Sequence, residues 1–230
     1  MTQKTSKGPC YQCGALHTKG TFLRHFDSAH PVQGAALQVC TRLKIESADD
    51  LTYWLIVDAG ETATLKTLDG FLRRIWLECC GHMSGFFCQR ESVGKGQKIA
   101  VLPEGLKLRY EYDFGSTTEL KITVLGHGLR PKQREAVRVL ARNVAPEHVC
   151  RICGEPAAAY CVECEWEHQS PFLCPDCGMR HRQQHGGMLP VVNSPRMGVC
   201  AYCGEQDKYE FQPPCGDVPR AKGATAHDPV

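Results

Sequence analysis

Apolar and polar residues alternate with a period of two along several stretches in the middle of the chain. The longest runs over residues 37–45, where most odd-numbered positions are apolar. This alternation is typical of a β-strand with one buried face. The pattern predicts further strands over residues 53–57, 86–87, 107–112 and 119–125. Turn-forming residues 113–116 join the last two strands.

Residues 68–76 follow a helical period instead. The apolar positions at i, i+3, i+4, i+7 and i+8 are Leu68, Phe71, Leu72, Ile75 and Trp76. They form one stripe of an amphipathic helix, and Gly81 can end it. One principal helix against an antiparallel sheet predicts an α+β fold for the middle of the chain.

Residues 136–141 fit two elements. Val137 and Val139 alternate with Arg138, which favours a strand. As a helix, the same stretch would align Arg134, Arg138 and Arg142 on one face. We expect the strand.

Composition excludes some classes of protein. The 230 residues are 42% hydrophobic and 23% charged, which fits a folded chain rather than a disordered one. Without a long apolar run we expect no membrane association, and without an apolar leader near the start we expect a cytoplasmic protein. A net charge of +2 indicates no partner class, so any basic surface must be local.

Cysteine is the informative residue type. The chain has 15 cysteines, and such an odd number without a secretory signal argues against a disulfide framework. Ten of them form CxxC pairs: Cys10/Cys13, Cys150/Cys153, Cys161/Cys164, Cys174/Cys177 and Cys200/Cys203. The other five are predicted to be core residues or free thiols: Cys40, Cys79, Cys80, Cys88 and Cys215.

These features divide the chain into four parts. Residues 1–34 are a predicted zinc finger, and 35–145 a domain with its own apolar core. Residues 146–206 are too rich in cysteine and histidine for an independent core and are predicted to fold around metal. Residues 207–230 are expected to form a loose tail.

The N-terminal part has the spacing of a Cys2His2 finger. Cys10 and Cys13 are followed after eleven residues by His25 and then His30. Two thiolates and two imidazoles suit a closed tetrahedral zinc site, with Phe22 and nearby apolar residues as a small core. A single finger fits nucleic-acid contact or protein docking equally well.

The C-terminal part permits two arrangements of ligands. A cross-brace, which resembles B-box modules, places one zinc on Cys150, Cys153, Cys174 and Cys177, and another on Cys161, Cys164, His181 and His185. A ribbon would instead join Cys150/Cys153 to Cys200/Cys203. In either case Cys200 and Cys203 are candidate ligands, and we expect two or three zinc ions in the whole chain.

Three segments resemble the plasmid pRiA-type Orf-three-like family in its zinc-carrying bacterial branch. They are residues 67–86 around the tryptophan-containing helix, 110–120 around Tyr-Asp-Phe-Gly, and 188–200. The similarity covers about residues 36–203 and leaves out the finger. The resemblance implies an α+β fold found on plasmids and insertion sequences, and it implies no activity.

Few residues suggest catalysis. His82 could be a general base, but without a carboxylate partner at recognisable spacing we interpret it as a packed residue. Asp113 and Glu119 could bind a cation, but such acids more often serve turns and cross-strand pairs. We therefore expect no enzymatic activity.

The combined prediction is a zinc-binding adaptor of mobile-element type, with a nucleic-acid partner and a protein partner for the C-terminal module. The basic residues expected to neutralise phosphates are Lys4, Lys7, Lys19, Arg24, Arg134, Arg138 and Arg142. The alternative is a protein-interaction module without nucleic acid, and a zinc- or acid-dependent enzyme is a third hypothesis.

Overall fold

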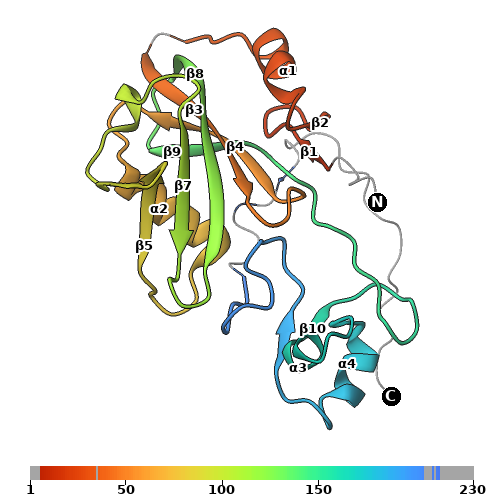
Figure 1. The fold of residues 1–230 in the computed structure, drawn as a ribbon. Helices are drawn as coiled ribbons and strands as arrows, with labels where there is room; N and C mark the ends of the chain where they lie inside the picture. Colours follow the sequence, from red (N-terminus) through yellow and green to blue (C-terminus); the bar gives the residue numbers. More distant parts are fainter. Residues whose placement is uncertain (1–5, 35, 205–208, 210, 213–230) are drawn as a thin grey trace, which may run out of the picture.

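A computed structural model describes residues 6–34, 36–204, 209 and 211–212. Its centre is a seven-stranded sheet in which all neighbours are antiparallel (Figure 1). In spatial order the strands are β6 (Glu91–Val93), β5 (Ser84–Cys88), β7 (Lys107–Tyr112), β8 (Thr118–Pro131), β3 (Leu37–Ser47), β4 (Trp54–Gly60) and β9 (Val137–Arg142). The mixed fold with a mainly antiparallel sheet agrees with the predicted α+β class.

The middle of the sheet is the long pair β3 and β8. Their register runs from Leu37 opposite Pro131 to Ser47 opposite Leu120, with an irregularity between Arg42 and Leu43. Gly126 lies at this point with a φ of 142°, a conformation that residues with a Cβ rarely adopt. Strand β8 therefore continues beyond residue 125, where the sequence pattern predicted its end.

Helix α2 (Leu65–Leu72) covers one face of the sheet. Thr64 and Thr67 form a reciprocal capping box at its start. A π-helical segment, η1 (Arg73–Leu77), extends the helix, so the predicted stripe at 68–76 is helical throughout. Leu68, Phe71 and Trp76 pack with the inward-facing side chains of the sheet in the main core.

The N-terminal part, predicted to be a zinc finger and called the finger below, packs on the opposite face. It consists of strands β1 (Lys7–Pro9) and β2 (Leu16–Thr18) and helix α1 (Phe22–Ala29). Phe22 and Phe26 are buried together with Trp54 and Ile56 of β4, whose neighbours Leu55 and Val57 point into the main core. The alternation along β4 thus gives the sheet two apolar faces.

Strand β9 confirms the predicted strand at 136–141, and the helical alternative is wrong. The finger forms backbone hydrogen bonds with β9 and with the segment just after it. The Tyr11 N–H donates to Leu140 O at 2.9 Å, and the Val144 N–H donates to Lys7 O at 2.8 Å. Gly8 permits this approach, since a Cβ there would lie 1.9 Å from Arg142 O. The finger is joined to the sheet by backbone as well as by side chains.

The C-terminal module lies apart from the sheet at the end of an extended segment (Figure 1). Its elements are β10 (Ala159–Cys161), α3 (Val162–Trp166), β11 (Phe172–Leu173), α4 (Pro175–His181) and β12 (Met188–Pro190). Its buried apolar cluster consists of five cysteines and Leu173. A module with so small a core needs another source of stability.

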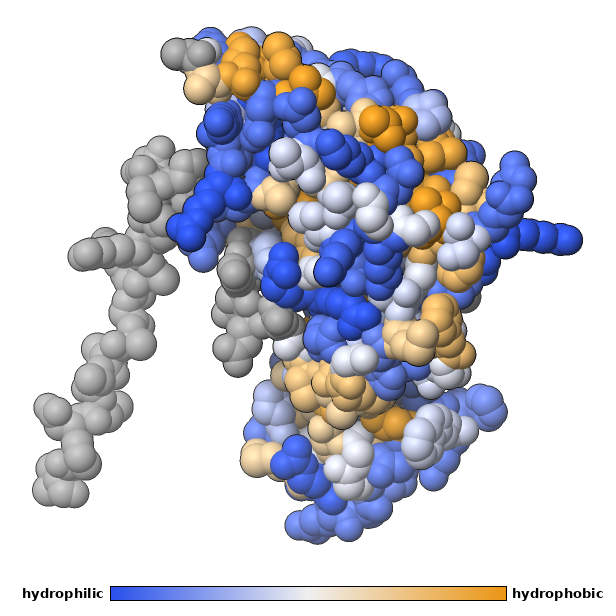
Figure 2. Space-filling model, turned by 90° about the vertical axis from the view of Figure 1, so that its left-hand side faces the viewer, coloured by the Kyte–Doolittle hydropathy of each residue, from blue (hydrophilic) through white to orange (hydrophobic). Residues whose placement is uncertain are grey.

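The surface carries no single broad apolar area on the side shown in Figure 2, where hydrophobic side chains form separate patches among hydrophilic ones. No helix within the described ranges has the length and hydropathy needed to cross a membrane. The predicted tail, including Cys215, lies outside the described residues, except for Tyr209, Phe211 and Gln212.

Candidate metal centres

Among the residues that the structure describes, the fold brings cysteine and histidine side chains together in four clusters. In each cluster one ligand atom from each of four residues lies within 4.8 Å of all the others. The clusters are Cys10/Cys13/His25/His30, Cys150/Cys153/Cys174/Cys177, Cys161/Cys164/His181/His185 and Cys79/Cys80/His82/Cys200. Such ligand sets could bind metal, and thiolate with imidazole is the donor chemistry of zinc.

The finger cluster combines a turn with a helix. Cys10 and Cys13 flank the turn between β1 and β2, where the Gly14 N–H donates to Cys10 O at 2.8 Å, whereas His25 lies on α1 and His30 ends it. Cys10 Sγ and His30 Nε2 are 3.4 Å apart, as are Cys13 Sγ and His25 Nε2. Sulfur and nitrogen ligands of one tetrahedral zinc are separated by about 3.5 Å, so the set fits.

The first cluster of the C-terminal module is all cysteine. Cys153 Sγ lies 3.6 Å from Cys174 Sγ and 3.8 Å from Cys177 Sγ, close to the spacing of about 3.8 Å for two thiolates on one zinc. The Ile152 N–H donates to Cys150 Sγ, and the Cys177 N–H donates to Cys174 Sγ, both at 3.4 Å. These amides stabilise thiolates.

The second cluster of the module lies between α3 and α4. Cys164 Sγ is 3.1 Å from His181 Nε2 and 3.4 Å from His185 Nδ1, and Cys161 Sγ is also 3.4 Å from His185 Nδ1. The two clusters draw on alternating CxxC pairs, which is the cross-brace arrangement. The ribbon that joined Cys150/Cys153 to Cys200/Cys203 is not formed.

Cys200 and Cys203 are separated by the fold. Cys200 belongs to the fourth cluster, whereas Cys203 lies outside all clusters found among the described residues, and its Sγ is 3.3 Å from Ala201 O. Cys79 and Cys80, predicted to be core residues or free thiols, are free thiols that lie in this cluster, a placement that the sequence did not reveal. Cys40, by contrast, is buried outside any cluster, as predicted.

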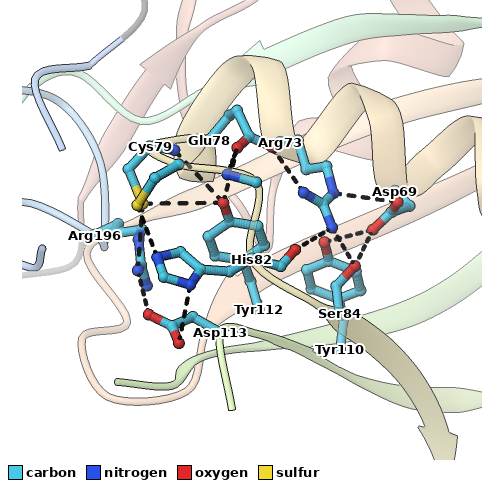
Figure 3. Close-up of polar contacts among 12 residues, drawn as sticks. Asp69, Arg73, Glu78, Cys79, His82, Ser84, Tyr110, Tyr112, Asp113 and Arg196 are labelled. Atoms are coloured by element: carbon cyan, nitrogen blue, oxygen red, sulfur yellow. Dashed lines mark hydrogen bonds and ion pairs between the residues drawn. The ribbon is translucent and has the colours of Figure 1, made fainter. Parts of the chain in front are cut away.

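His82 has a carboxylate partner that the sequence did not reveal. Its Nδ1 lies 3.5 Å from Asp113 Oδ1, and the buried Arg196 donates to Asp113 Oδ2 at 2.7 Å (Figure 3). Burial acts to raise the pKa of Asp113, but the hydrogen bond from Arg196 and those from backbone amides hold it below its ordinary value. Asp113 thus serves an ion pair in the turn, and Glu119 lies beside Arg109 at 3.7 Å.

A second polar network lies beside this one, beneath α2 (Figure 3). Asp69 accepts hydrogen bonds from Ser84 Oγ at 2.6 Å and from Tyr110 OH at 2.8 Å, and it pairs with Arg73 and Lys95. Burial opposes ionisation, but these partners outweigh it and the pKa of Asp69 is lowered. Every group around the carboxylate stabilises its charge, so the network fastens α2 to strands β5 and β7.

Several residues predicted to contact phosphate are engaged within the protein. Lys19 forms an ion pair with Glu46 at 2.6 Å, Arg138 pairs with the buried Asp58, and Arg142 is buried and donates to Asn193 O. Arg138 lies directly opposite Asp58 on the neighbouring strand β4, so its ion-pair partner is a residue that is distant in sequence. Three predicted residues are exposed, namely Lys7, Arg24 and Arg134, and Lys4 lies outside the described residues.

A groove of about 480 Å³ runs along the junction of finger and sheet. Its walls include Phe26 and His30 of the finger, and its floor carries Arg42, Arg130 and Arg138. Asp58 is the carboxylate among its lining residues, and the exposed Asp27 pairs with Arg42 at the rim. The groove keeps an excess of one positive charge. Sequence analysis missed Arg42, because its neighbours in space come from another part of the chain.

Comparison with known proteins leaves the function open. No protein-family model matches the chain, and no curated protein matches it. A solved structure that matches is a protein of unknown function, MM3350, from Methanosarcina mazei Go1, with 14% sequence identity and a TM-score of 0.37. The match covers 51% of this chain and 75% of the other. Membership of the plasmid Orf-three-like family therefore stays a prediction.

Proposed function

We propose that this chain is a non-enzymatic zinc-binding adaptor. The observation that carries the proposal is that the finger and both cross-brace clusters bring together complete sets of four cysteine and histidine ligands. Four protein ligands fill a tetrahedral zinc and leave no position for a substrate or an activated water. Zinc in such sites supplies folding energy and holds small recognition surfaces in shape.

As the partner of the finger we propose the backbone of a nucleic acid. The loop that follows Pro131, a lining residue of the junction groove, exposes Lys132 and Arg134. Arg24 is exposed on α1. Guanidinium groups bind phosphate by paired hydrogen bonds.

Binding of zinc-loaded protein to DNA and RNA probes, measured by fluorescence anisotropy across a salt series, tests this proposal. We expect affinity to fall steeply between about 50 and 200 mM salt. The double variant Arg24→Gln/Arg134→Gln removes two exposed charges and should reduce the slope of log affinity against log salt by about two. Lys66→Gln/Lys107→Gln removes the same charge from α2 and β7, away from the groove, and should leave the slope unchanged.

Equal slopes for the two double variants would contradict the assigned surface. Absence of binding at low salt, by protein that holds its zinc, would remove nucleic acid as the partner. Protein docking would then be the better function, through the groove that Val162, Trp166 and Met188 of the C-terminal module line together with residues 198–201. Trp166 is 73% exposed, and such aromatic side chains beside a groove are typical of protein interfaces.

A further inference from the structure

The fourth cluster joins two parts of the chain that are far apart in sequence. Cys79, Cys80 and His82 lie in the short loop after η1, and Cys200 arrives from a segment 120 residues later than Cys80. That segment is held against the central domain on its way. Ser194 Oγ donates to Trp76 O at 2.6 Å, and Arg196 donates to Thr118 Oγ1 at 3.0 Å.

The four ligand atoms lie within 4.8 Å of one another, close enough to surround one ion. Cys80 Sγ lies 3.6 Å from Cys79 Sγ, 3.3 Å from Cys200 Sγ and 3.0 Å from His82 Nε2, and His82 Nε2 is 3.7 Å from Cys200 Sγ. On one zinc the expected separations are about 3.8 Å for two sulfurs and about 3.5 Å for sulfur and nitrogen. The cluster thus resembles the three predicted centres in its dimensions.

The surroundings of the cluster also suit a metal. His82 points Nε2 toward the thiols and Nδ1 toward Asp113, an orientation in which the carboxylate fixes a ligating imidazole. Arg196 donates to both Asp113 Oδ2 and Cys79 Sγ, at 2.7 and 3.5 Å. Three thiolates and one imidazole on Zn²⁺ leave one negative charge, and the buried guanidinium that Asp113 and Cys79 share lies beside it.

We propose that Cys79, Cys80, His82 and Cys200 bind a fourth zinc ion, which fastens the segment around residues 194–202 to the central domain. The three other centres each hold together one module. This one connects the end of the C-terminal module to the loop after η1, and it goes beyond the adaptor function by fixing how the parts are joined. Cys80 and Cys200 are exposed, so this zinc is open to solvent on one side.

Metal content of the full chain, expressed in zinc-rich medium and purified without chelator, tests the proposal. We expect four zinc ions per chain for the wild type and three for Cys200→Ser. The matched control is Cys203→Ser, the same replacement three residues away at an exposed thiol outside the cluster, and it should keep all four. Cys80→Ser, on the opposite side of the site, should lose the same ion.

A second measurement does not depend on the number of zinc ions per chain. Hydrogen exchange of the amides of Met197, Val199 and Tyr202 should become faster in Cys200→Ser and remain slow in Cys203→Ser, because these amides lie in the fastened segment. Three ions in the wild type and in Cys200→Ser would overturn the fourth site while leaving the adaptor proposal intact. Fewer than three ions in the wild type would contradict both.

Discussion

The central domain and the C-terminal module achieve stability by different means. The sheet and α2 enclose a continuous apolar core in which Trp76, Leu68 and Phe86 are fully buried. The module buries five cysteines and Leu173 in its cluster, and its helices α3 and α4 have only five and seven residues. Burial of apolar area accounts for the stability of the central domain. In the C-terminal module, the candidate metal ligands occupy the interior in place of an apolar core.

This difference indicates which perturbation each region should respond to. A side-chain truncation in the sheet removes a small part of a large apolar core. Loss of one metal from the module removes the contact between all its elements at once, because each cluster joins a turn or helix to another that follows later in sequence. The finger lies between the two, since it has a predicted zinc site but also packs Phe22 and Phe26 on the sheet.

The largest expected effect separates the two regions by removing metal. Chelation at neutral pH should unfold the C-terminal module and leave the central domain folded, because structural zinc contributes about 10 to 16 kcal/mol per site. NMR or hydrogen exchange would show loss of protected amides around Cys161 and Cys174 but not along β3 and β8. Restoration by added zinc is the control. A module that keeps its protection without metal would contradict the distinction.

The same distinction explains what the sequence predicted. Period-two alternation and the apolar stripe at 68–76 arise because these residues pack against an apolar core. The strands and the helix that they predicted are present. CxxC spacing identifies candidate ligands that are close in sequence, so it predicted the group of the finger and the ligands of the C-terminal module, but it left the choice between cross-brace and ribbon open. It could not predict the fourth cluster, in which Cys79 and Cys80 are adjacent and Cys200 comes from another region.

Ion pairs between residues distant in sequence could not be predicted from the sequence either. Arg138 was predicted to face a nucleic acid, but it pairs with Asp58 on the adjacent strand β4, as does the buried Arg130. A run of arginines along a strand shows neither which of them face inward nor which acid meets them. Both facts follow from the register of β4 with β9, which depends on the whole sheet.

A smaller effect, confined to the central domain, comes from Asp69→Asn. The substitution leaves Arg73 and Lys95 without their buried carboxylate, and we expect a loss of about 2 to 3 kcal/mol of unfolding free energy at pH 7 with zinc content unchanged. Urea denaturation of both proteins measures it. Glu61→Gln, at an exposed position before α2, is the control and should change stability little.

The pH dependence of this loss has a definite sign. The pKa of Asp69 in the fold lies below its ordinary value of 3.8, so its stabilisation is complete above the unfolded value and disappears as pH falls through the folded one. The difference between wild type and Asp69→Asn should therefore be constant from pH 7 to about 5 and shrink in more acid solution. A difference that grows on acidification would contradict the assigned ionisation of Asp69.

The smallest expected effect comes from the capping box at the start of α2, and it tests whether the stability of the central domain depends on metal. Thr64 Oγ1 accepts from the Thr67 N–H at 3.3 Å, and Thr67 Oγ1 accepts from the Thr64 N–H at 3.2 Å. Thr64→Ala breaks this capping box at the start of α2 and should cost about 1 kcal/mol, whereas Thr64→Ser keeps the hydroxyl and should cost less. Because the cap stabilises a helix whose apolar residues pack in the core of the central domain, and none of its residues belongs to a metal cluster among the described residues, the loss should be the same with and without chelator. A loss that vanished on chelation would mean that the central domain itself depends on zinc, which would end the distinction between the two regions.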